Sequence, residues 1–214
     1  MRPRRLRVLM AVIALLGWAA IAVQLVLTVR MVRDNGRSLG AGVALYLAYF
    51  TILTNLLCAV AVSFPLLAPH SRPAGFFTRP SVITGATAAI LLVGVAYNAF
   101  LRQYDHPHGA GVLTNAQLHL LMPLLFTLYW WYAVPAGSIG WGDIPTWLVY
   151  PVLYMGYMLL RGAWTGHYPY PILDVRRLGY GGVLLHGAGL LLLTTLTGVL
   201  LTALKRPRAP APQP

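Results

Sequence analysis

The sequence predicts an all-α polytopic membrane protein, a bundle of six transmembrane helices, and two observations carry that prediction. Only 9% of the 214 residues are charged, and 58% are hydrophobic. A soluble domain carries about a quarter charged residues, which keep its surface in water. The apolar residues also fall into uncharged runs, and several of these reach the ~20 residues that a helix needs to cross ~30 Å of hydrocarbon. We therefore expect lipid to surround most of the chain.

The first three helices are expected over residues 8–29, 42–67 and 82–101. The first run follows an Arg-rich N-terminus but exceeds the 7–15 apolar residues of a secretory signal, so it predicts a spanning helix. Turn-forming Pro69 and Pro73 follow the second run. Pro80 suits the first position of the third helix, because a proline there loses no helical hydrogen bond.

The last three helices are expected over residues 115–134, 144–160 and 178–204. Thr114 and Gln117 form a capping-box pattern at the start of the fourth. Residues 1–204 thus form one transmembrane domain, and residues 205–214 form a basic, Pro-rich tail that we expect to be disordered. The single cysteine, Cys58, lies inside an apolar run and is expected to be a packed free thiol.

The net charge of +12, from 16 basic and 4 acidic residues, excludes neither lipid nor nucleic acid by itself. The basic residues lie in the gaps between apolar runs, where they attract anionic headgroups. We therefore expect membrane lipids as partners and no nucleic acid. An even number of spans puts both termini on one side, and a small excess of Arg and Lys there favours a cytoplasmic location. The oligomeric state stays open.

Polar side chains inside the apolar runs indicate a site, because such groups are costly in hydrocarbon. At 1.5 Å per residue, Thr51, His119 and His186 lie roughly 6–13 Å below the same membrane face. Asn98 lies near that face in the antiparallel third helix, and Asn55 is one turn from Thr51. Pro123 removes the helical partner of the His119 carbonyl, which favours a hydrated pocket. Each polar residue could instead join helices by hydrogen bonds.

A hydroxyl beside an imidazole forms a minimal nucleophile and base, since a neutral His can take the hydroxyl proton. We expect Thr51 to attack and His119 to accept the proton. Asn55 or Asn98, with His186 as a further polar contact, would bind the oxyanion or the substrate. The G-x-S-x-G spacing at 36–40 (GRSLG) lies between two apolar runs rather than after a predicted strand, so we do not expect an α/β-hydrolase. We expect no cofactor and no metal.

Three segments carry a resemblance to a known family: 49–56 (YFTILTNL), 118–123 (LHLLMP) and 165–174 (TGHYPYPILD). They resemble blocks of the androgen-induced-gene and androgen-dependent TFPI-regulating protein family, and of bacterial six-helix membrane proteins. The resemblance implies a hydrolase of fatty acid esters of hydroxy fatty acids in a bacterial plasma membrane. It implies a lipophilic ester substrate, a Thr nucleophile and a His partner, which become Thr51, or alternatively Thr54, and His119.

Other functions fit the same residues. A transporter or receptor could bind a small amphiphile in the polar layer without chemistry, although no inverted repeat is apparent. Asp105, His106 and His108, with His167 and Asp174 on the same face, could offer metal ligands. His119 with His186 could ligate haem. The aromatic segment 168–171 is typical of an interfacial belt and could equally cover the polar layer as a lid.

Overall fold

The computed structural model describes residues 3–207, and within that range every regular element is helical. Arg2 and residues 208–214 of the expected tail lie outside the described range. The α-helices are α1 (Pro3–Asp34), α2 (Leu39–Tyr46), α3 (Phe50–Leu67), α4 (Arg72–Phe77), α5 (Pro80–Ala96), α6 (Ala110–Ala116), α7 (Met122–Ala133), α8 (Ile144–Thr165) and α9 (Val175–Leu204). Short helical turns are η1 (Tyr97–Leu101), η2 (Arg102–Tyr104), η3 (Gln117–Leu121), η4 (Trp141–Asp143) and η5 (Pro171–Leu173).

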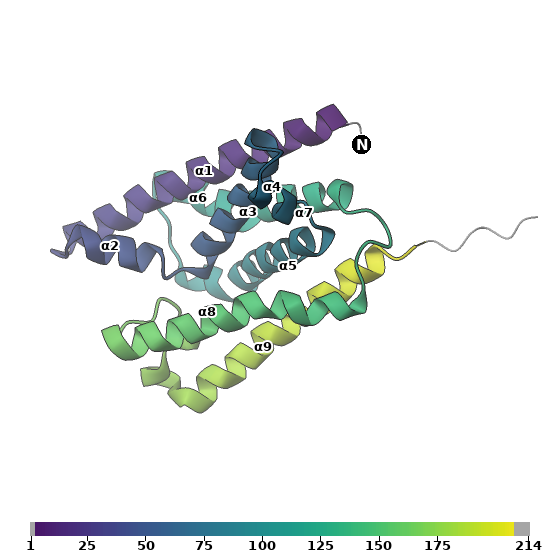
Figure 1. Ribbon diagram of the computed structural model, residues 1–214. Helices are drawn as coiled ribbons and strands as arrows, with labels where there is room; N and C mark the ends of the chain where they lie inside the picture. The colour runs from purple at the N-terminus through teal and green to yellow at the C-terminus, as the bar shows by residue number, and fades with distance from the viewer. Residues whose placement is uncertain (1–2, 208–214) are drawn as a thin grey trace, which may run out of the picture.

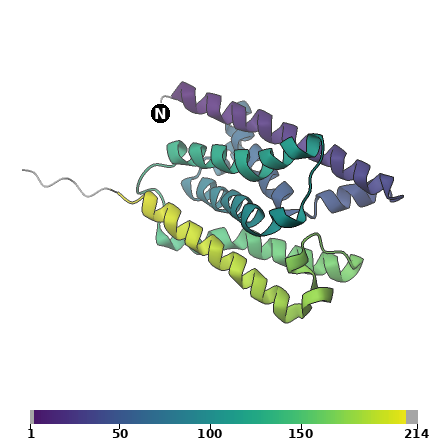
Figure 2. The same cartoon turned by 180° about the vertical axis from the view of Figure 1, so that it is seen from behind.

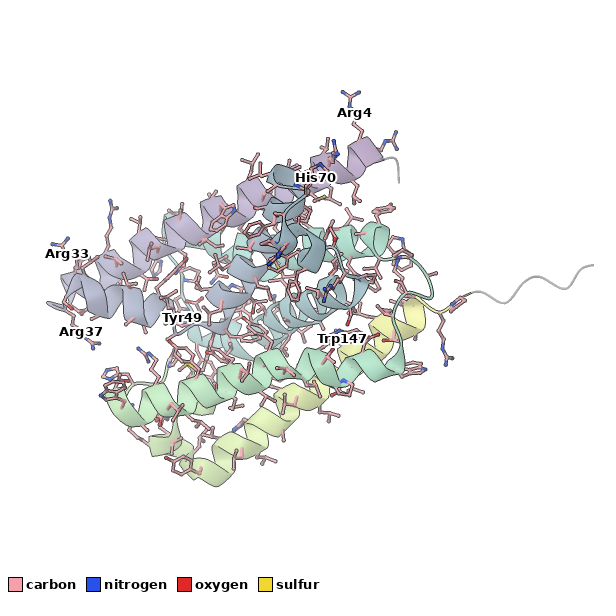
Figure 3. All side chains as sticks on the ribbon, viewed as in Figure 1. Arg4, Arg33, Arg37, Tyr49, His70 and Trp147 are labelled. Atoms are coloured by element: carbon pink, nitrogen blue, oxygen red, sulfur yellow. The ribbon has the colours of Figure 1, made fainter. Side chains whose placement is uncertain are left out.

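Helix α5 lies in the middle of the bundle, with α1 on one side and α8 and α9 on the other (Figure 1). It packs against α3, α7, α8 and α9, and its small and aliphatic side chains, such as Ala88 and Ile90, are fully buried. The start of α1 and the end of α9 lie at the same end of the bundle in both views (Figures 1 and 2). Arg33 and Arg37 project outward at the opposite end from Arg4 (Figure 3).

Among residues 3–207, five helical stretches are long and apolar enough to cross a membrane. They are Arg4–Asp34, Phe50–Leu67, Pro80–Tyr104, Ala110–Ala133 and Val175–Leu204. The predicted count of six is not reached by these criteria, because α8 is not among them. Helix α8 is 22 residues long, but many of its residues are tyrosine, tryptophan, proline or glycine, which are less hydrophobic than leucine or isoleucine.

The predicted second helix, 42–67, is broken in the structure. Helix α2 ends at Tyr46 and α3 begins at Phe50. Two carbonyl oxygens near the break accept hydrogen bonds from tyrosines of α8, Ala48 from Tyr154 at 2.8 Å and Leu47 from Tyr157 at 3.5 Å. Ala48 is fully buried, and an unpaired backbone group is costly when buried, so the bond from Tyr154 stabilises the break. The break places Thr51 in the first turn of α3.

The third helix begins at Pro80 as predicted, whereas the capping box predicted at Thr114 and Gln117 is wrong. Helix α6 begins at Ala110, after Gly109, and Thr114 bonds the Ala110 carbonyl from inside the helix. Gln117 instead donates to the carbonyl of Leu16 in α1, at 2.7 Å. Both this helix and α5 continue through a π-helical turn, η3 and η1 respectively. Such turns are often found at functional sites.

The C-terminal end of α9 is tied to aromatic residues. The Lys205 ammonium donates to the Trp131 carbonyl at 2.6 Å and lies 5.0 Å and 4.7 Å from the Trp130 and Trp131 ring centroids. Arg206 lies over the Trp141 ring at 4.9 Å. These two residues of the expected tail are therefore held against the bundle. Cys58 is a buried free thiol, as predicted.

Candidate active site

The structure brings Thr51 and His119 together. Thr51 lies in the first turn of α3, His119 lies in the π-helical turn η3, and the Thr51 Oγ1 and His119 Nε2 atoms are 3.2 Å apart. Both side chains are half-buried. This distance is at the long end of a hydrogen bond, and it is short enough for a proton to pass from the hydroxyl to the ring.

The other ring nitrogen of His119 fixes its tautomer. Nδ1 lies 3.1 Å from the backbone carbonyl oxygen of Asn115. A carbonyl can only accept a hydrogen bond, so in the neutral ring Nδ1 carries the proton and Nε2 keeps its lone pair for Thr51. The Tyr97 ring stacks on the imidazole at a centroid distance of 3.7 Å and an angle of 17°. These contacts hold the plane of the ring.

The Asp105 carboxylate is linked to His119 through Tyr97 and Asn115. The Tyr97 hydroxyl donates to Asp105 Oδ2 at 2.8 Å. The Asn115 amide donates to the Tyr97 hydroxyl at 2.7 Å and to Asp105 Oδ2 at 2.5 Å. Asp105 therefore fixes Tyr97, which stacks on His119, and Asn115, whose carbonyl orients His119. Sequence reasoning missed this role because Asp105 lies in a loop outside the apolar runs.

Asn98 supports the backbone behind His119. Because Pro123 has no N–H, the His119 carbonyl lacks its usual helical partner. The Asn98 amide donates to this carbonyl at 3.2 Å and to the Gly94 carbonyl at 2.9 Å. A Cβ at Gly94 would lie 3.3 Å from the His119 carbonyl oxygen, so the two helices approach closely here.

Asn55 joins the helix of Thr51 to the turn of His119. Its side chain is fully buried, and its amide donates to the Thr51 carbonyl at 2.8 Å and to the Leu118 carbonyl at 3.3 Å. Its Oδ1 atom is buried and has no partner among the described residues. Asn55 therefore fixes the spacing of the two helices.

The other two candidates point elsewhere. The Thr54 hydroxyl is buried and pairs with the Tyr150 hydroxyl at 3.0 Å, so only Thr51 of the two threonines contacts His119. His186 is exposed on α9, and its Nδ1 pairs with the Gly182 carbonyl at 2.9 Å. It lines neither of the two cavities that His119 borders.

Two cavities meet at Thr51. A polar chamber of about 610 Å³ is lined by residues that include Tyr49, Thr51, Asp105, Asn115 and His119. A smaller apolar pocket of about 70 Å³ extends between α5, α8 and α9, and its lining includes Val93, Met155, Leu190 and Leu191. Thr51, Tyr97, Leu101 and Tyr170 line both. The site therefore has a polar side and an apolar side.

Tyr170 belongs to the segment between α8 and α9, which covers the site. Its ring meets the Tyr49 ring edge-on, with centroids 5.7 Å apart. Burial raises the pKa of the Tyr170 phenol to about 12, and hydrogen bonding with the side chain and backbone of Thr51 and with the backbone of Phe50 opposes that rise. Sequence reasoning considered this segment as a belt or a lid but did not single out Tyr170.

Within residues 3–207, no group of three or more His, Cys, Asp or Glu side chains is placed to hold a metal ion. Both ring nitrogens of His119 face protein partners. Comparison of the chain with protein-family models, curated proteins and solved structures finds no match.

Proposed function

We propose that this protein is an intramembrane hydrolase of lipid esters, with Thr51 as the nucleophile and His119 as the base. The observation that supports it best is the 3.2 Å approach of Thr51 Oγ1 to the unprotonated Nε2 of His119. A hydroxyl that keeps its proton is a poor nucleophile toward an ester. A base positioned to take that proton contributes about 10²–10⁴-fold to the rate.

The reaction has two halves. Thr51 Oγ1 attacks the ester carbonyl carbon as its proton passes to His119 Nε2, and the carbonyl oxygen becomes an oxyanion. When the oxyanion collapses, the ester C–O bond breaks, the departing alcohol takes the proton from His119, and Thr51 is left acylated. A water molecule then attacks the acyl carbon and gives a proton to His119. The carboxylic acid leaves, and Thr51 recovers its proton.

The two cavities suit an amphiphilic substrate. The apolar pocket would take part of an acyl chain, and the polar chamber would take the alcohol portion and admit water. The outward faces of the helices carry large exposed apolar side chains, such as Leu15, Leu153 and Leu185. Such faces are expected where lipid is the solvent, so the substrate would enter from the bilayer.

We further propose that α8 is a sixth span and that both termini lie on the cytoplasmic side of a bacterial plasma membrane. With 22 residues, α8 is long enough to cross. The start of α1 and the end of α9 lie at the same end of the bundle (Figure 1), as an even number of spans requires. In intact cells, an impermeant maleimide should label Asn35→Cys and spare Arg4→Cys; the reverse pattern would contradict this orientation.

Hydrolysis of p-nitrophenyl octanoate by purified protein in detergent micelles tests the function. Wild type should turn over this ester, Thr51→Ala should abolish turnover, and His119→Ala should lower it by at least about 10²-fold. Thr54→Ala is the matched control, because its hydroxyl lies one turn away and contacts Tyr150. Activity that persists in Thr51→Ala would exclude Thr51 as the nucleophile.

A transporter or receptor for amphiphiles is the second candidate, because the joined polar and apolar cavities would also suit binding alone. In that case purified wild type would bind the ester without releasing p-nitrophenol, and Thr51→Ala would bind it equally well.

A further inference from the structure

The geometry points to Tyr170 as a further catalytic residue, whose hydroxyl donates a hydrogen bond to the oxyanion formed when Thr51 attacks an ester. This inference rests on the proposed function, because the oxyanion forms only if Thr51 reacts. Hydrogen-bond donors aimed at the developing charge are usually the largest single contribution to such a reaction. A hydrolase of this kind therefore needs donors beside Thr51.

The two asparagines near Thr51 have no free N–H for this purpose. A side-chain amide carries two N–H bonds. Asn55 uses them on the carbonyls of Thr51 and Leu118. Asn98 uses them on the carbonyls of Gly94 and His119. Both amides therefore hold the backbone in place, and the donor must come from another element.

Tyr170 lies where that donor is needed. It lines both the polar chamber and the apolar pocket, as Thr51 does, so it lies at the junction where the ester group of an amphiphile would be placed. Its ring meets that of Tyr49, the residue before α3, and it lines the apolar pocket together with Phe50 and Thr51. Tyr97 also lines both cavities, but its hydroxyl already donates to Asp105.

The backbone at the start of α3 also offers hydrogen-bond donors. Phe50 and Thr51 are the first two residues of α3, and the Tyr49 side chain does not cap the helix. The first N–H groups of a helix have no partner within it, and the helix dipole adds partial positive charge there. Tyr170 lines the same pocket as these two residues. A substrate oxyanion between them would thus meet donors from two elements.

The segment that carries Tyr170 is anchored at both ends. Gly166, with φ of +66°, ends α8 in a left-handed conformation that favours glycine. The Arg161 guanidinium donates to the His167 carbonyl at 2.9 Å. At the other end, the Asp174 carboxylate accepts from the backbone and side chain of Arg176. These contacts keep Tyr170 in position, as an oxyanion donor requires.

Kinetics of Tyr170→Phe test the inference, with p-nitrophenyl octanoate in micelles. Phenylalanine keeps the ring and removes only the hydroxyl, so kcat should fall about 10²–10³-fold, the usual effect of losing one oxyanion donor, with KM changed by less than about 3-fold. Tyr168→Phe is the matched control, since Tyr168 lies in the same segment and lines neither cavity. Its kcat should match that of wild type.

The outcomes separate the two proposals. Hydrolysis that depends on Thr51 and His119 but is unchanged in Tyr170→Phe would overturn the role of Tyr170 and leave the hydrolase standing. A rise in KM alone would also overturn it, by showing a binding role. Absence of hydrolysis in wild type would overturn both. If Tyr170→Phe does not fold, Tyr170→Gln, which keeps a donor, should exceed Tyr170→Leu in kcat by at least about 10-fold; equal values would overturn the role.

Discussion

Replacing Gly162 by alanine should displace the segment that covers the site. Gly162 lies in the last turns of α8, directly beneath the Tyr168 ring. A Cβ there would overlap that ring, with three ring atoms inside 3.0 Å, a separation that real Cβ contacts essentially never show. Tyr168 must therefore move, and Tyr170, two residues later, would move with it. We expect p-nitrophenyl octanoate hydrolysis to fall to the level of Tyr170→Phe.

A second glycine in α8 separates the packing effect of Gly162→Ala on stability from the higher helix propensity of alanine. A Cβ added at Gly156 would have no neighbour within 4 Å, so Gly156→Ala should stabilise α8 by about 0.5–1 kcal/mol. Gly162→Ala gains the same propensity but adds overpacking of about 1–3 kcal/mol. The two variants should thus differ by about 2 kcal/mol, or roughly 4–8 °C in Tm.

Thermal unfolding in detergent, followed by tryptophan fluorescence, measures this difference, and the ester assay measures activity on the same samples. Equal Tm values and equal hydrolysis rates in Gly162→Ala and Gly156→Ala would contradict this prediction. That result would mean that the segment 166–174 does not pack on α8 as the structure has it.

Two further predictions concern Asn55 and Asp174. Asn55→Leu keeps the branched shape of the side chain but loses two buried hydrogen bonds, so the free energy of unfolding should fall by about 1–3 kcal/mol. Asn35→Ala loses one exposed bond to Met31 and should stay within about 0.5 kcal/mol of wild type. Equal effects in unfolding measurements would contradict this. The hydrogen bond from Arg176 lowers the pKa of the Asp174 carboxyl in the folded state. The ionised Asp174 therefore stabilises the fold above the ordinary carboxyl pKa of about 3.9, and this stabilisation is lost as the pH falls through the lowered folded pKa. The Tm of wild type should therefore drop more steeply below about pH 4 than that of Asp174→Asn, and parallel curves would rule out this contribution.

The layer of polar residues could be predicted from the sequence in part. Depth along each helix follows from residue spacing, and it correctly predicted that Thr51 and His119 could meet. Depth does not fix the direction in which a side chain points around its helix. His186 lies at a similar predicted depth but is exposed on α9, because the packing of whole helices decides which face turns inward.

The break between α2 and α3 could not be predicted from local sequence. Residues 47–49 contain no glycine or proline, and the released carbonyls are satisfied by Tyr154 and Tyr157, which are more than 100 residues later. For the same reason the contacts of Asp105 and the role proposed for Tyr170 were not apparent. Both lie in connecting segments, and their contacts with the site depend on the fold.

Mass spectrometry of protein treated with a fluorophosphonate tests most directly whether Thr51 forms the proposed covalent bond to the substrate. A phosphonyl adduct should appear on Thr51 in wild type and in Thr54→Ala, and it should be strongly reduced in His119→Ala. An adduct on a different residue, or active protein that hydrolyses esters without any adduct on Thr51, would contradict Thr51 as the nucleophile.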